Sequence, residues 1–242
     1  MRKFSVFTAC FLLLFASMSV AYGANVQTPE QDLKKTFPQF KFDSFRETHV
    51  KGIYEIVSGG QVFYFSPQGY LFFGELYSKD GVNITAQRRS ELIASRAKDL
   101  SLDMAIKIGS GKNTVIEFAD PECPFCRKAY EHLAKRKDIT QYVFLFPLAQ
   151  IHPQAMEMSK YILCSADRGM TYDQAMRGEL DGKKLQVPAG CNKEDVLNED
   201  IEAGKKAGVN GTPAFFIHGK FVNGANLPLI DKLLGASLPL GE

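Results

Sequence analysis

Two cysteines three positions apart have the most reactive side chains in this chain of 242 residues. Cys123 and Cys126 follow the apolar stretch 114–119, which predicts a buried strand, and they begin a stretch with helical pattern. Pro124 suits the first position of a helix, so Cys123 would stand at the helix start. The partial positive charge there favours a thiolate, the form of cysteine that attacks a disulfide. The spacing therefore predicts a redox dithiol, with Cys123 as nucleophile and Cys126 as resolving thiol.

Two other interpretations of this pair fit the sequence less well. A zinc site needs a second closely spaced pair of ligands, and Cys164 and Cys191 are far from each other and from any suitably spaced histidine. A purely structural bridge between Cys123 and Cys126 would close too short a loop to constrain the unfolded chain. We therefore expect no metal and no cofactor.

The other two cysteines, Cys164 and Cys191, lie 27 positions apart around a helical stretch. A bridge between them would remove roughly 3 to 4 kcal/mol of loop entropy from the unfolded chain, according to the chain-entropy model. We predict a structural disulfide. The alternative is a second redox couple, although neither cysteine has a partner at the Cys-x-x-Cys spacing.

The elements around the dithiol follow a strand–helix–strand order. The strand 114–119 precedes a helix over about 124–137, and a second apolar strand spans 141–146. Such a unit places a site at the carboxyl ends of its strands. Further along, the pattern predicts a mostly helical insert over 152–207 with Asn192 and Gly208 as caps of its last helix, then strands at 214–217 and about 221–222, and a helix over about 228–234.

An antiparallel sheet is predicted before this region. Its strands are 52–57, 61–65 and 70–76, with glycine- and proline-containing turns between them. So small a sheet leaves unpaired edges and buries little surface, so we expect a partner surface, most simply that of a second copy. Thr85 is predicted to cap a connecting helix that runs to about Leu100.

The first 23 residues have the features of a secretory signal peptide. Arg2 and Lys3 precede the apolar run 4–20, and the small residues Ala21 and Gly23 follow it. An uncleaved membrane anchor is the alternative. Cleavage would leave 27 basic against 27 acidic residues and four cysteines. This balance provides no basic footprint for nucleic acid.

Several of these features together resemble a known family. The motif Phe118-Ala-Asp-Pro-Glu-Cys-Pro-Phe-Cys126, the turn Gly211-Thr212-Pro213, the second cysteine pair and the strand-rich N-terminal region are similar to the periplasmic protein-disulfide isomerases of the DsbC/DsbG type. The resemblance implies an α+β protein with a cystatin-like antiparallel dimerisation domain, a linker helix and a C-terminal thioredoxin-like domain with a helical insert. It also implies a periplasmic homodimer that acts on mis-oxidised exported proteins and is kept reduced by a membrane reductase of the DsbD type.

After cleavage of the signal peptide, we expect no membrane insertion. The resemblance divides the chain into four parts. The parts are a signal peptide at 1–23, an N-terminal dimerisation domain at 24–82, a linker helix at 83–104 and a thioredoxin-like catalytic domain at 105–242, whose helical insert spans about 152–207.

The resemblance also assigns site residues outside the cysteine motif. Pro213 would be a cis-proline beside the dithiol, and the backbone of Thr212 before it would bind extended substrate; a plain trans turn is the alternative. Glu117 matches the position of the buried carboxylate of thioredoxins and of the DsbA oxidase. By this resemblance, Glu117 would be buried and would assist proton transfer at Cys126. The alternative is an exposed glutamate on a strand.

Three further polar residues lie near the motif. Asp120 and Glu122 flank the nucleophile, and as exposed acids they would oppose its ionisation only weakly. His152 starts the helical insert, and we expect a loop or capping histidine, with contact to the cysteines as the alternative.

The predicted function is isomerisation or reduction of incorrect disulfides. The dipeptide Pro124-Phe125 is nearer to the Pro-Tyr of the DsbG type than to the Gly-Tyr of the DsbC type, which leaves the balance between isomerase and reductase open. The alternatives are a dithiol oxidase and a holdase chaperone with incidental cysteines.

Overall fold

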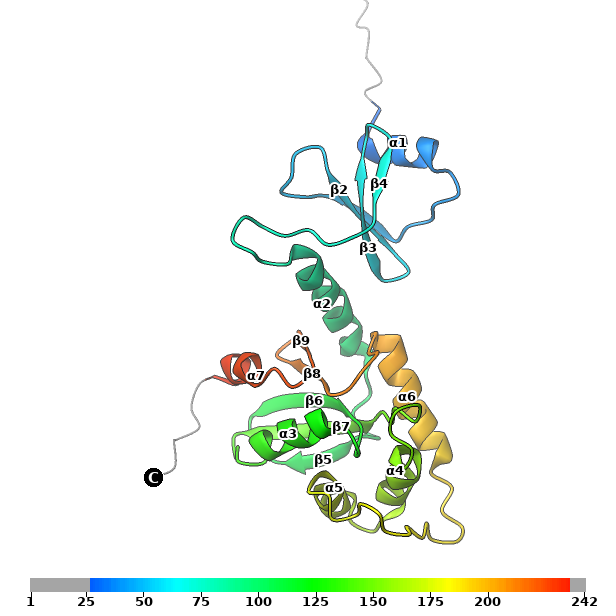
Figure 1. Ribbon diagram of the computed structural model, residues 1–242, viewed down its shortest axis with the longest axis vertical. Helices are drawn as coiled ribbons and strands as arrows, with labels where there is room; N and C mark the ends of the chain where they lie inside the picture. Colours follow the sequence, from blue (N-terminus) through cyan, green and yellow to red (C-terminus); the bar gives the residue numbers. More distant parts are fainter. Residues whose placement is uncertain (1–26, 236–242) are drawn as a thin grey trace, which may run out of the picture.

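Two separate sheets organise the chain in the computed structural model, which describes residues 27–235 (Figure 1). A four-stranded sheet has the order β1-β2-β3-β4, and a five-stranded sheet has the order β5-β7-β6-β8-β9. The helix α2 (Ile84–Arg96) joins the two parts. The signal peptide predicted at 1–23 lies outside the described residues. No helix within 27–235 is both long and apolar enough to cross a membrane.

The N-terminal sheet is an antiparallel meander with one more strand than predicted. Leu33 on the helix α1 (Pro29–Thr36) packs with the buried Ile56 and Phe65 of the sheet. The strand that was not predicted is β1. Its pairing with β2 is stabilised because the ring of Phe45 stacks on the ring of Tyr54, with centroids 5.1 Å apart. The strands are β1 (Ser44–Glu47), β2 (Tyr54–Ser58), β3 (Gln61–Ser66) and β4 (Tyr70–Phe72).

Two predictions at the end of this sheet are wrong. The last strand stops at Phe72 instead of residue 76, because the N–H of Leu76 donates to Thr85 Oγ1 (2.7 Å) and not to a neighbouring strand. Thr85 does not cap α2, since its buried hydroxyl is bound to Leu76 and to the hydroxyl of Tyr64 (2.6 Å). The cap is Asn83, whose side chain accepts a hydrogen bond from the N–H of residue 86 (2.8 Å).

The connecting helix α2 is fastened to both parts of the chain. Near its start, Arg88 donates to the buried carboxylate of Glu55 (2.9 Å), which also binds Arg46 of β1 (2.7 Å). Near its end, Ile93 packs on the core of the C-terminal domain, as does Ala97 of the following 3-10 turn Ala97–Asp99. The α-helix thus ends four residues before the predicted position.

The C-terminal sheet is mixed. Its centre is the predicted strand–helix–strand unit of β6 (Asn113–Ala119), α3 (Pro124–Leu133) and β7 (Ile139–Leu145), in which the two strands are parallel. The other three strands pair antiparallel, and only the first of them was not predicted. They are β5 (Ile106–Gly109), β8 (Ala214–Ile217) and β9 (Lys220–Asn223).

The insert between β7 and β8 contains three helices, α4 (Ala155–Cys164), α5 (Arg168–Met176) and α6 (Glu194–Ala207). A disulfide between Cys164 and Cys191 joins the end of α4 to the segment before α6. Lys193, not Asn192, occupies the N-cap of α6, without a side-chain hydrogen bond. Gly208 ends α6 as predicted, in a left-handed conformation with φ of 90°.

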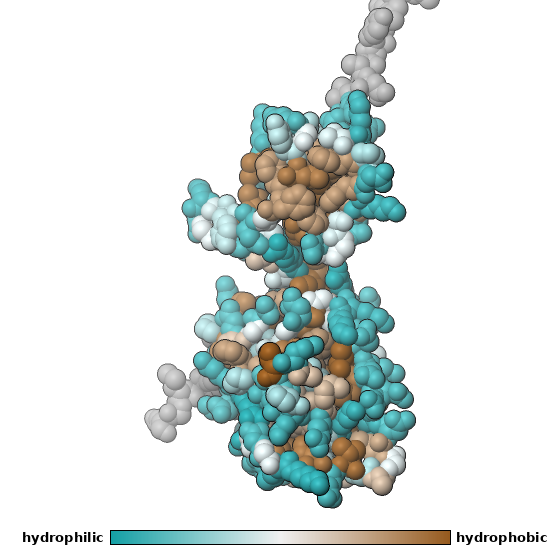
Figure 2. Space-filling view, turned by 45° about the vertical axis from the view of Figure 1, so that its right-hand side comes forward, coloured by the Kyte–Doolittle hydropathy of each residue, from teal (hydrophilic) through white to brown (hydrophobic). Residues whose placement is uncertain are grey.

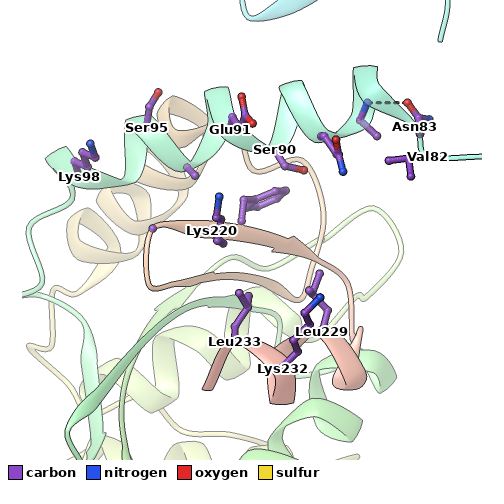
Figure 3. Close-up of a pocket in the computed structure, with 15 residues that line it drawn as sticks. Val82, Asn83, Ser90, Glu91, Ser95, Lys98, Lys220, Leu229, Lys232 and Leu233 are labelled. Carbon is purple, nitrogen blue, oxygen red and sulfur yellow. Dashed lines mark hydrogen bonds between the residues drawn. The ribbon is translucent and has the colours of Figure 1, made fainter. Parts of the chain in front are cut away.

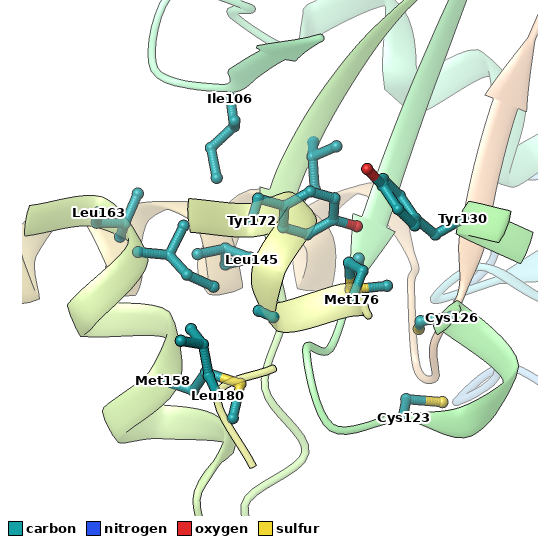
Figure 4. Packing of buried hydrophobic residues seen from close by; sticks show 14 of the residues in the cluster. Ile106, Cys123, Cys126, Tyr130, Leu145, Met158, Leu163, Tyr172, Met176 and Leu180 are labelled. Carbon is teal, nitrogen blue, oxygen red and sulfur yellow. The ribbon is translucent and has the colours of Figure 1, made fainter. Parts of the chain in front are cut away.

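Helices cover both faces of this sheet. On one face, Val115 and Phe215 pack under α3 and the final helix α7 (Leu227–Leu234). On the other face, Phe118 and Phe144 pack against α6 and the end of α2. A third cluster lies between the sheet and α4 and α5 and extends to the two free cysteines (Figure 4).

Candidate active site

The free cysteines stand where β6 turns into α3. Cys123 is the N-cap of α3 and has extended backbone angles, and Pro124 occupies the first helical position. The N–H of Cys123 donates to the carbonyl of Asp120 (3.1 Å), which closes the tight turn after β6. The nucleophilic position therefore faces the open end of the helix, where main-chain N–H groups have no partner within the helix.

The two sulfurs differ in their exposure. Cys123 keeps 4% of its surface exposed, whereas Cys126 is fully buried under the start of α3 (Figure 4). The sulfur of Cys123 also lies 3.6 Å from the carbonyl oxygen of Thr212, which precedes β8, and the bond from Thr212 to Pro213 is cis. Of the two cysteines, only Cys123 keeps any surface open to solvent.

The ionisation of the two thiols is strongly asymmetric. A hydrogen bond from the Cys126 thiol lowers the pKa of Cys123 to about 5, against the opposing effect of burial and with help from the N–H groups of Cys126 and Phe125. Burial, the hydrogen bond to Cys123 and the nearby carboxyl of Glu117 all raise the pKa of Cys126 far above its ordinary value. At neutral pH the outer sulfur is a thiolate and the inner one a thiol.

Glu117 lies on the face of β6 that α3 covers. It is fully buried, so it is not an exposed strand glutamate. Burial raises the pKa of Glu117 to about 8, although a hydrogen bond from the amide of Gln141 on β7 favours the ionised form. The carboxyl can therefore hold or release a proton near neutral pH.

Asp120 does not have the exposed position expected for it. Its side chain is completely buried. The carboxylate accepts hydrogen bonds from the turn around the cysteines and from the segment after β7. One oxygen accepts from the N–H of Glu122 (2.8 Å), and the other accepts from the N–H of Leu148 (2.6 Å) and contacts Nδ1 of His152 (2.9 Å). The expectation of a weak, screened acid at this position is wrong.

His152 belongs to the segment between β7 and α4, and this segment is bound to the dithiol turn. Besides the contact of His152 with Asp120, the N–H of Gln154 donates to the carboxylate of Glu122 (2.7 Å). His152 thus reaches the residues before the cysteines but is not bonded to a sulfur.

Sequence reasoning did not single out Gln141 and Tyr172. Gln141 is the one long amide in a strand of mostly apolar residues, and its burial at this position could have indicated a polar partner on β6. Tyr172 of α5 is fully buried in the same cluster as Cys126, with its ring edge-on to Tyr130. Burial and the nearby Glu117 and Cys126 raise its pKa.

A groove of about 720 Å³ lies away from the dithiol, between α2 and the β9–α7 region (Figure 3). Ser90, Lys98, Lys220 and Lys232 contribute polar groups to it, and Leu229 contributes apolar surface. None of the candidate site residues lines it. The exposed apolar groups near Cys123 are Phe125 (62% exposed) and, on the segment that is bound to the dithiol turn, Ile151 (67%).

A parallel strand–helix–strand unit that presents a Cys-x-x-Cys pair at a helix start, with a cis-proline opposite, defines the thioredoxin-fold thiol:disulfide oxidoreductases. Comparison with known protein families agrees with this class. Residues 100–229 match the "Thioredoxin-like domain", and residues 21–86 match the "Disulfide bond isomerase protein N-terminal domain". The chain therefore belongs to the thioredoxin-like proteins and, within them, to the disulfide isomerase family of the DsbC/DsbG type. The predicted family and the α+β fold class are confirmed.

Curated relatives are proteins of the same type. The probable thiol:disulfide interchange protein DsbC of Bordetella avium is 32% identical over 169 residues, which are 68% of this chain and 58% of that protein. DsbC of Salmonella typhimurium is 27% identical over 91% of this chain and 89% of its own length. DsbG of Escherichia coli is 27% identical over 66% of this chain and 69% of its own length.

Among solved structures, a disulfide interchange protein from Neisseria gonorrhoeae is 30% identical to this chain. The match covers 57% of this chain and all of that protein, with a TM-score of 0.46.

Proposed function

We propose that the protein is a periplasmic thiol:disulfide interchange protein that isomerises or reduces incorrect disulfides in exported proteins. The observation that carries the proposal is the asymmetry of the dithiol, with a reachable Cys123 of low pKa above a fully buried Cys126 of high pKa. A low pKa provides the attacking thiolate at neutral pH and stabilises the reduced form.

The exchange begins at Cys123. Its thiolate attacks one sulfur of a substrate disulfide and forms a mixed disulfide, and the other substrate sulfur leaves as a thiolate. In isomerisation, a substrate thiolate then attacks the sulfur bound to Cys123, forms the correct disulfide and frees Cys123. In reduction, Cys126 attacks the sulfur of Cys123 instead, which leaves the dithiol oxidised and the substrate reduced.

Substrate binding is assigned to the surface around Cys123. The carbonyl of Thr212 faces the sulfur at 3.6 Å, and an extended polypeptide can pair with main-chain groups there. Pro213 holds the turn that presents this carbonyl. The exposed ring of Phe125 between the two cysteines offers apolar contact to unfolded chains.

Glu117 is proposed as the proton acceptor for Cys126. The resolving thiol must lose a proton before it attacks, and the buried carboxyl of Glu117 is near enough to act on its sulfur electrostatically, as the Cys123 sulfur also does. With a pKa of about 8, Glu117 is partly ionised near neutral pH, and this ionised fraction can take the proton of Cys126.

Homodimerisation is assigned to the N-terminal domain. Figure 2 shows apolar side chains gathered on one face of this domain. Near the edge strand β4, the rings of Tyr70 (62% exposed), Phe72 (44%), Phe73 (72%) and Tyr77 (59%) face solvent. Exposed aromatic surface beside an unpaired strand edge favours pairing with a second copy. We further propose reduction by a membrane reductase of the DsbD type, and export by the signal peptide at 1–23.

The test is refolding of a scrambled multi-disulfide protein by the purified chain, together with its native mass. Recovery of native substrate should depend on Cys123 and fail in a Cys123→Ser variant. A Cys126→Ser variant should accumulate mixed disulfides through Cys123, and the native mass should be that of a dimer. If oxidation of reduced peptides is faster than reduction, the protein is a dithiol oxidase. Aggregation suppression without exchange activity would identify a holdase.

A further inference from the structure

His152 contacts the turn between β6 and α3 that leads into the two cysteines. Nδ1 is 2.9 Å from the buried carboxylate of Asp120, and the histidine side chain keeps 17% of its surface exposed. The same carboxylate oxygen accepts from the N–H of Leu148, so both contacts come from the segment after β7. Among the described residues, His152 is the only side chain bonded to Asp120, because its other partners are main-chain N–H groups.

The main chain of Asp120 touches both cysteines. Its carbonyl accepts from the N–H of Cys123 (3.1 Å), and its own N–H points to the sulfur of Cys126 (3.5 Å). The second contact matters for chemistry, because a hydrogen bond to the sulfur favours the ionised form of Cys126. Burial and the negative charge of Glu117 act in the opposite direction.

This donor can act in the resolving step. In that step the sulfur of Cys126 loses its proton and attacks the sulfur of Cys123. The new bond joins Cys123 to Cys126, the bond from Cys123 to the substrate sulfur breaks, and the substrate leaves as a thiolate. The two cysteines are oxidised and the substrate is reduced, so no other oxidant or reductant is required. Negative charge on the buried sulfur of Cys126 is stabilised only by donors that are already in place.

We propose that His152 is a positioning residue for this step, because through the carboxylate of Asp120 it holds the N–H of residue 120 against the sulfur of Cys126. The inference rests on the dithiol exchange proposed above and deepens it. Attack by Cys123 does not require this contact, because the pKa of Cys123 is lowered by Cys126 and by N–H groups at the start of α3. The two steps of the reaction should therefore respond differently to changes at His152.

The experiment separates the two steps in the full chain. The reduced protein is mixed rapidly with a disulfide-bonded fluorescent peptide, and formation and release of the mixed disulfide are followed as two phases. In His152→Leu the release phase should slow by about tenfold, the effect of one lost hydrogen bond to a charged group. In His152→Asn, which retains a side-chain N–H near the position of Nδ1, release should stay within about threefold of the unchanged protein. Formation should keep its rate in both variants.

The chain provides a matched control on α3. His132 is also paired with an aspartate, because its Nε2 lies 2.9 Å from Asp231 in a partly buried contact. This pair belongs to the last turn of α3, at the end opposite the cysteines. His132→Leu should leave both phases unchanged, so a general loss of helix stability would be recognised by its effect in this variant.

Several outcomes would overturn the inference. Release that stays unchanged in His152→Leu would contradict it, as would equal slowing of formation and release, or equal slowing in His132→Leu. If His152→Leu does not fold, Asp120→Asn replaces it. That variant keeps the size of the side chain, removes its charge, and should slow release alone. If the unchanged protein forms no mixed disulfide at Cys123, the proposed function fails and the inference fails with it.

Discussion

The sulfur of Cys123 lies 3.6 Å from the carbonyl oxygen of Thr212, although 89 positions separate the two residues. The contact arises because β8 pairs antiparallel with β6, so that the start of β8 meets the end of β6. The proposed nucleophile and the carbonyl proposed to accept a hydrogen bond from substrate thus lie at the same end of the sheet.

The ionisation of Cys123 should depend on its partner. Replacing Cys126 by alanine removes the hydrogen bond that contributes most to the low pKa of Cys123. We expect the midpoint of Cys123 thiolate formation to rise from about 5 by about one unit or more. Ultraviolet absorbance of the thiolate against pH measures it, and Cys126→Ser, which can still donate, should shift the midpoint less. An unchanged midpoint in the alanine variant would assign the low pKa to the helix start alone.

Glu117 by itself should make the protein less stable as the pH rises, whereas the lowered pKa of Cys123 acts in the opposite direction. The unfolded carboxyl releases its proton near its ordinary pKa of 4.5, whereas the folded one keeps its proton until about 8. The contribution of Glu117 to the free energy of unfolding therefore decreases from about pH 4.5 to 8 and changes little above that range. Glu117→Gln should raise the free energy of unfolding by up to about 4 kcal/mol at pH 8 and change it little at pH 4.

Chemical denaturation of the reduced protein at the two pH values measures this effect. Glu131→Gln on the exposed side of α3 is the control and should change stability little at either pH. An equal effect of Glu117→Gln at both pH values would contradict a buried, protonated carboxyl.

Loss of the disulfide between Cys164 and Cys191 should weaken the fold without changing the dithiol. It closes a segment of 27 positions, so replacing both cysteines by serine should lower the free energy of unfolding by about 3 kcal/mol. Denaturant titration measures the loss. The thiolate titration of Cys123 should be unaltered, and a shift in that titration would favour a second redox couple.

The buried carboxylate of Glu55 should be important for the attachment of α2. Arg46 and Arg88 both bind it, so Glu55→Gln removes the buried counter-ion that the two guanidinium groups share and leaves Arg88 with the exposed Glu91 alone. We expect a loss of about 2 kcal/mol or more in the free energy of unfolding, measured with denaturant. Glu91→Gln removes the exposed partner of the same Arg88 and should cost less than about 0.5 kcal/mol. Similar losses in the two variants would contradict the role of burial.

Local patterns in the sequence located most elements of the C-terminal domain. The strand over 214–217 and the end of α6 at Gly208 were predicted at the observed positions. Apolar periodicity and glycine conformation act over a few neighbouring residues, so a single segment contains the information. The strand β1 and the cap of α2 were missed because each depends on a partner elsewhere in the chain. Phe45 needs Tyr54, and the hydroxyl of Thr85 is taken by Tyr64 and Leu76.

By itself, the order of residues determined that a cysteine pair follows a buried strand and starts a helix, and this sufficed to predict redox chemistry. Only the tertiary structure decided which acids act on that pair. Asp120 is buried because the segment after β7 supplies Leu148 and His152 to its carboxylate, and Glu117 is paired because β7 lies beside β6 with Gln141 within reach. The environment of a charge depends on groups that are close in space and distant along the chain, and burial in such an environment can change a pKa by several units.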